Sequence, residues 1–140
     1  GWTPSPFGGR IESPLRSSIV AADVDEWEDE ARGWTNFRAW LEAIERRGTS
    51  LNIGSFVGGA TIREYAKGWD MGNANPDEIE TMCRVMDECM RDGAFGIATA
   101  LIYPPGSYAG TEELVRIAEV IARYGGVYIT HIRSESDLLL

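Results

Sequence analysis

The sequence predicts an α/β protein whose strands run parallel and are connected by helices. Three apolar, β-branched segments, at residues 49–57, 94–101 and 127–131, alternate with segments that carry helix start and stop signals. This alternation is the pattern of βα units in a parallel sheet. The last strand segment ends on His131, the only histidine among the 140 residues. Because α/β folds build their sites at the carboxyl ends of strands, we expect chemistry at His131.

Residues 1–34 are expected to form an irregular, acidic lead-in to the βα units of residues 35–140. The chain opens with Gly1–Gly9, which contains too much proline and glycine for regular structure. The stretch Asp23–Glu30 carries much of the formal net charge of −9. We interpret this stretch first as a solvated segment that favours a helix, and second as a docking patch for a partner.

The first long helix is expected over Trp34–Gly48, with Thr35 as its N-cap and a left-handed turn at Gly48. The strand at residues 49–57 follows, because Leu51, Ile53 and the residues after them alternate with polar or small residues. A short helix over residues 61–67 then leads to a loop rich in glycine and asparagine.

The next helix has the clearest start signal in the chain. Asn75 can act as the N-cap, Pro76 suits the first helical position, and Glu78 can close a capping box. This helix should end near Arg91. The second strand, at residues 94–101, leads into a rigid loop over Tyr103–Tyr108.

A third helix is expected from a cap at Thr111 to Gly125, and the strand at residues 127–131 follows it. The continuous apolar character of this strand predicts that it is buried. Cys83 and Cys89 fall within the helix that ends near Arg91, beside an apolar stripe, so we expect them to be core residues. Reduced thiols fit a cytoplasmic protein.

The composition excludes several classes of function. An acidic chain lacks the basic patches that neutralise nucleic-acid phosphates, so a nucleic-acid partner is not expected. The apolar runs are shorter than the roughly 18 residues that a spanning helix needs, and no basic-then-apolar signal opens the chain. We therefore expect a cytoplasmic protein without a membrane partner.

The loop at Tyr103 and the strand end at His131 are expected to share one rim of the sheet. An aromatic hydroxyl and an imidazole on one rim suggest a polar pocket. If the strand alternation continues, His131, Arg133 and Glu135 lie on one face. The alternatives are a histidine held by a backbone carbonyl and a tyrosine that only packs its ring.

Three motifs resemble the D-aminoacylases, the N-acyl-D-amino-acid deacylases of the amidohydrolase superfamily. They are Asn52–Gly58 followed by Arg63, Gly93–Ala109, and Tyr124–Glu135. The resemblance, which runs from about residue 34 to the end, implies a TIM (β/α)8 barrel and zinc-dependent hydrolysis of the amide in N-acyl-D-amino acids. Zinc would activate water and polarise the acyl carbonyl.

By the same resemblance, His131 is a zinc ligand and Tyr103 contacts the small-molecule substrate. Arg133 and Glu135 are candidates for orienting the His131 imidazole without contacting the metal themselves. The alternative is that they form a structural ion pair. The family's other histidine and aspartate ligands have no counterpart in this sequence, and the catalytic base is among them.

We therefore expect residues 1–140 to be an internal part of the barrel, with about three of its parallel strands and their helices, inactive by itself. Two alternatives are a related amidohydrolase, dihydroorotase-like or dipeptidase-like, and a non-catalytic α/β domain that binds a partner.

Overall fold

The computed structural model describes residues 1–13 and 24–135, and within them it contains a three-stranded parallel sheet. The strands β1 (Val57–Gly58), β2 (Gly96–Ala100) and β3 (Val127–His131) lie in that spatial order. The register pairs Val57 with Ile97, and Ile97 with Tyr128. The predicted parallel α/β class is therefore confirmed.

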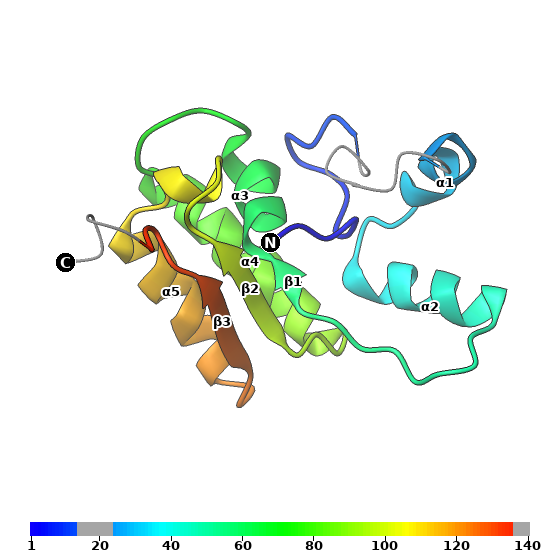
Figure 1. Ribbon diagram of the computed structural model, residues 1–140. Coiled ribbons are helices and arrows are strands. Elements are labelled where there is room, and N and C mark those ends of the chain that lie inside the picture. The colour runs from blue at the N-terminus through cyan, green and yellow to red at the C-terminus, as the bar shows by residue number, and fades with distance from the viewer. Residues whose placement is uncertain (14–23, 136–140) are drawn as a thin grey trace.

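The helices in the described residues are α1 (Val24–Ala31), α2 (Phe37–Arg47), α3 (Gly59–Lys67), α4 (Pro76–Arg91) and α5 (Thr111–Ala122), with a 3-10 turn η1 at Gly106–Tyr108. Of these, α3, α4 and α5 pack on one face of the sheet. Figure 1 shows α4 and α5 behind the strands, and α1 and α2 beyond the β1 edge. None of the helices in the described ranges is long and apolar enough to cross a membrane.

The core lies between the sheet and the apolar face of α4. That face carries the methionines and cysteines that the sequence placed in a stripe, and both Cys83 and Cys89 are buried and unbridged. Burial raises the pKa of both thiols, so both cysteines are packing residues rather than reactive ones. The core side chains are Phe37, Val57, Ile62, Ile79, Met82, Cys83, Val85, Met86, Cys89, Met90, Ala94, Ile97, Ile117, Val120 and Ile121.

The predicted N-cap is correct for α4 and displaced by one residue for α2 and α5, whereas Gly48 ends α2 with a positive φ, as predicted. Asn75 accepts from the backbone N–H of Glu78, whose carboxylate accepts from the backbone N–H of Asn75, which completes the predicted capping box. Asn36, rather than Thr35, caps α2, because its side chain accepts from Ala39. The N-cap of α5 is Gly110 and not Thr111, which is already helical.

The predicted strand at residues 49–57 is wrong except at its end. Only Val57 and Gly58 pair as a strand, and one further bond joins the N–H of Phe95 to the carbonyl of Ser55. Leu51 is 74% exposed and Ile53 50% exposed. In the register that pairs Val57 with Ile97, Leu51 and Ile53 lie beyond the point where β2 begins. Among the described residues they therefore have no neighbouring strand with which to form a ladder.

The prediction that β3 is buried is also wrong for this chain. Every residue of β3 is exposed, including Val127 at 51% and Ile129 at 43%. Among the described residues, the strand lies at the edge of the sheet and pairs only with β2. Its apolar side chains therefore lack the cover that a parallel sheet normally has on both faces.

The lead-in is more ordered than its composition indicates. Most of the acidic stretch forms α1, while Asp23 lies outside the described residues. Near the N-terminus, Thr3 contacts the first turn of α3 through Thr61 and accepts a hydrogen bond from the N–H of Gly58. The first residues thus cross the sheet face that the helices leave open, beside β1 (Figure 1).

A buried ion pair connects α3 and α5. The guanidinium of Arg63 donates to the carboxylate of Glu113 and to the carbonyl of Gly72, and the two charged side chains are 1% and 4% exposed. Burial raises the pKa of Glu113, whereas Arg63 acts to lower it. The pair also holds the loop between α3 and α4 through Gly72.

We predict that Arg63→Leu lowers the free energy of unfolding by about 3–5 kcal/mol at neutral pH, because it leaves Glu113 buried without a counter-charge. The pKa of Glu113 then rises further above its ordinary value of 4.5. The folded state of the variant therefore binds a proton more readily than the unfolded state, and its deficit shrinks as the pH is lowered toward that value. Urea unfolding at a series of pH values measures this dependence.

The matched control is Arg84→Leu, which removes an exposed pair with Glu88 on the surface of α4. Exposed pairs of this spacing contribute about 0.3–0.5 kcal/mol, so this variant should unfold almost like the parent at every pH. A deficit for Arg63→Leu that is small, or that grows on acidification, would contradict the assignment.

Candidate functional site

The carboxyl ends of β2 and β3 bring the predicted site residues together. His131 pairs in register with Ala100, and the N–H of Leu101 donates to the carbonyl of His131 at 2.9 Å. Because side chains alternate along a strand, Ala100 and His131 lie on the face opposite to the buried Ile97. The imidazole therefore lies on the open face of the sheet.

Tyr103 lies next to His131, although the loop that carries it follows a different strand. The centroids of the phenol and imidazole rings are 5.9 Å apart, with 50° between their planes. Tyr103 is 60% exposed, so its ring is not part of the core. The structure brings these two residues to one rim, whereas their roles as substrate contact and metal ligand stay predictions.

Both ring nitrogens of His131 have neighbours within the same segment. Nδ1 is 3.2 Å from the carbonyl oxygen of Ile132, and Nε2 is 3.4 Å from the Oε1 atom of Glu135. If Nδ1–H donates to the carbonyl, the tautomer leaves the Nε2 lone pair free to bind a metal ion. Glu135 thus contacts the nitrogen that would bind the metal, so it is the carbonyl of Ile132, and not Glu135, that is placed to orient the imidazole from Nδ1.

Arg133 has a different contact from the predicted one. Its guanidinium donates to the carbonyls of Ser107 and Ala109, at 3.3 and 2.6 Å, in the loop that follows β2. Direct support of His131 by Arg133 is therefore not what the structure shows. The strand alternation could place Arg133 on a face but could not predict which neighbouring loop its long side chain reaches.

The N-terminal segment also lies on the open face, although its sequence does not predict this position. Gly1 lies against β2, where an added Cβ atom would be 3.0 Å from the carbonyl oxygen of Ala98. Its own carbonyl accepts from Ala60 at the start of α3. A loop composition rich in proline and glycine predicts irregular backbone but carries no signal for where that backbone packs.

The residues present do not by themselves fit a zinc ion. Within residues 1–13 and 24–135, no three histidine, cysteine, aspartate or glutamate side chains gather closely enough to hold a metal. A catalytic zinc site needs three protein ligands. His131 can supply one of them, with Glu135 beside it.

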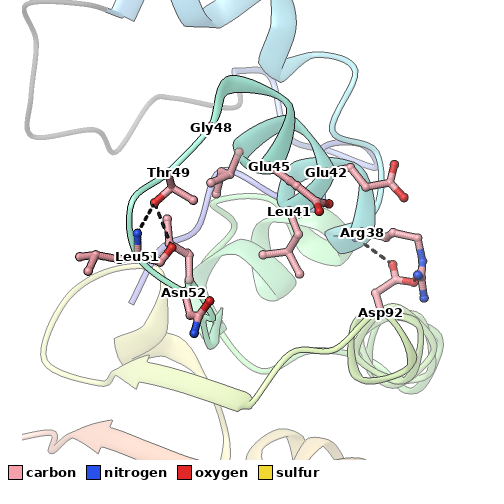
Figure 2. A pocket seen from close by; sticks show the side chains of 11 residues that line it. Arg38, Leu41, Glu42, Glu45, Gly48, Thr49, Leu51, Asn52 and Asp92 are labelled. Atoms are coloured by element: carbon pink, nitrogen blue, oxygen red, sulfur yellow. Dashed lines mark hydrogen bonds and ion pairs between the residues drawn. The ribbon is translucent and has the colours of Figure 1, made fainter.

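A groove elsewhere in the described residues lacks the features of a catalytic site. It has a volume of about 570 Å³ and lies between α2, the segment after it, and Asp92 at the end of α4. Figure 2 shows its carboxylates, Glu42 and Glu45, and the contact between Arg38 and Asp92. No histidine or cysteine lines it. Asp92 precedes β2, so the groove is at the opposite end of the strands from His131.

Comparison with known proteins identifies relatives of this chain over part of their length. No family model matches it. An N-acyl-D-aspartate deacylase of Alcaligenes xylosoxydans is 36% identical over 106 residues, which are 74% of this chain and 21% of that protein. The chain therefore spans about a fifth of the length of this curated relative.

Solved structures give the same result. A D-aminoacylase described as defining a subset of amidohydrolases matches with a TM-score of 0.76 and 28% identity, over 98% of this chain and 28% of its own. An N-acyl-D-glutamate deacylase from Bordetella bronchiseptica, complexed with zinc and a phosphonate inhibitor, matches with a TM-score of 0.71 and 28% identity, over 74% of this chain and 22% of its own.

We predict that the 140-residue chain alone retains well below one equivalent of zinc after dialysis, because its described residues gather too few ligands. Metal analysis of the dialysed chain measures the ratio. A His131→Ala variant of the same chain serves as the control and should retain the same small amount. One tightly held equivalent in the parent chain would contradict the ligand count.

Proposed function

We propose, from the homology of this chain to one segment of the D-aminoacylases of the amidohydrolase superfamily, that the full-length protein is a metal-dependent deacylase. It hydrolyses the amide bond of N-acyl-D-amino acids to a carboxylate and a free D-amino acid. The observation that carries the proposal is the meeting of Tyr103 and His131 at the carboxyl rim of a sheet that matches a D-aminoacylase over nearly all of this chain.

In this proposal the three strands are part of a TIM barrel, and the open face of the sheet is its interior. Two features support this interpretation. The helices cover one face only (Figure 1), and the apolar residues of β3 lack cover on the other. Further strands would supply that cover, and their carboxyl ends would bring the remaining ligands to the rim.

The residues of this chain have distinct roles in the proposal. His131 supplies one imidazole to a zinc site whose other ligands lie outside the described residues, and the carbonyl of Ile132 orients the imidazole from Nδ1. Tyr103 presents its hydroxyl to the substrate from a loop that two prolines stiffen. We also propose that the protein is cytoplasmic, because its two cysteines are unbridged.

The activity is tested by assaying the full-length protein on matched N-acyl D- and L-amino acids. Hydrolysis confined to the D series supports the proposal. Hydrolysis of cyclic amides or of L-dipeptides instead would favour a related amidohydrolase, and no hydrolysis of any of these substrates would reject the proposal.

We predict that His131→Ala in the full-length protein lowers the zinc content and abolishes turnover, with little change in the fold. The imidazole lies on the sheet face opposite to the helical core around Ile97, so its removal leaves that core intact. Metal analysis and circular dichroism measure the two effects separately. A variant that keeps the parent's zinc content would show that His131 is not a ligand.

We predict that Tyr103→Phe lowers kcat/KM by about ten- to 100-fold, the usual range for losing a hydrogen bond to a charged or reacting group. Phenylalanine keeps the ring against His131 and removes only the hydroxyl, so the melting temperature should stay within about 1 °C. Steady-state kinetics and thermal unfolding check both parts. Unchanged kinetics would assign Tyr103 to ring packing alone.

A further inference from the structure

The loop that carries Tyr103 is anchored in the core after Tyr103 but not at Tyr103 itself. Pro105 is fully buried and Ala109 is 5% exposed, whereas Ile102 is 39% exposed and Tyr103 is 60% exposed. The loop's own hydrogen bonds form a tight turn, in which the N–H of Ser107 donates to the carbonyl of Tyr103. Contacts with neighbouring segments then decide where this turn lies on the sheet.

Two contacts fix the side of the turn that faces β2. Gly106 packs closely on the end of the strand, because a Cβ atom added there would lie 2.7 Å from the carbonyl oxygen of Ala100. The N–H of Leu101 donates to the carbonyl of His131, so the hydrogen bonding between β2 and β3 continues for one residue after β2 ends. The backbone after His131 therefore runs beside the start of the loop.

Arg133 supplies the third contact. The last carbonyls of a helical turn have no partner within the turn, and the guanidinium of Arg133 donates to two carbonyls at this end, those of Ser107 and Ala109. Arginine suits this role because its planar fork presents two N–H donors at once, together with a positive charge at the carboxyl end of the turn.

We propose that Arg133 is a positioning residue, which holds the Tyr103 loop against the strand end that carries His131. Its effect on catalysis would pass through the Tyr103 hydroxyl rather than through the metal. This inference rests on the proposed function for its kinetic consequence, whereas the contact between Arg133 and the turn stands on the structure alone.

A double-mutant cycle in the full-length protein tests the proposal. Arg133→Met should lower kcat/KM by about ten- to 100-fold, since a displacement of about 1 Å at a reacting group can cost a factor of that size. In a Tyr103→Phe background the same substitution should cost less than about twofold, because the group that Arg133 positions is already missing. Zinc content should stay at the parent's level.

The control is Arg116→Met, which removes an arginine that pairs only loosely with Glu80 and Glu119 on the helix surface, at 3.8 and 3.7 Å. It should leave kcat/KM and zinc content unchanged. Equal losses for Arg133→Met in the two backgrounds, or a loss of zinc in Arg133→Met, would overturn the positioning role.

Amide hydrogen exchange gives a readout that needs no turnover. In Arg133→Met the amides of Ser107, Tyr108 and Ala109 should exchange about fivefold faster or more, whereas in Arg116→Met their rates should match the parent's. If the full-length protein hydrolyses no N-acyl amino acid, the proposed function fails, and exchange still decides whether Arg133 holds the turn. Unchanged exchange in Arg133→Met would reject the contact itself.

Discussion

Parallel pairing of β2 with both of its neighbours is the constraint on which the rest of this structure depends. A parallel neighbour can be reached only by a crossover, so each pair of strands is separated by helices that return the chain to the starting edge. All three strands consequently end at the same edge. This is why two loops that are distant in the sequence, after Ala100 and after His131, lie side by side.

The crossovers also determine where apolar surface can be buried. Helix α4 packs against both α3 and α5, and its apolar face lies toward the sheet. Its unbranched methionines fill the irregular space among these elements. The charged pair of Arg63 and Glu113 is an exception inside this apolar layer. It is accommodated because each charge faces the other and Arg63 also satisfies the carbonyl of Gly72.

The face of the sheet without helices is chemically different from the packed one. It carries His131 at its rim and the exposed apolar residues of β3 below it. Both features fit the proposal that further strands cover this face, and the chain spans about a fifth of the length of the N-acyl-D-aspartate deacylase to which it is similar. The groove beside α2 (Figure 2) lies at the other end of the strands and contributes no metal ligand from a histidine or cysteine.

The sequence by itself determined the features that depend on neighbouring residues: the capping box at Asn75, the strand that ends on His131, and the order of helices and strands. Only the tertiary structure decided that Leu51 and β3 are exposed and that Arg133 reaches the Tyr103 loop. The physical reason is that caps and alternation arise from contacts within a few residues, whereas burial and long side-chain contacts depend on which distant segment lies alongside. An apolar strand sequence is the same whether or not a neighbouring strand is present to cover it.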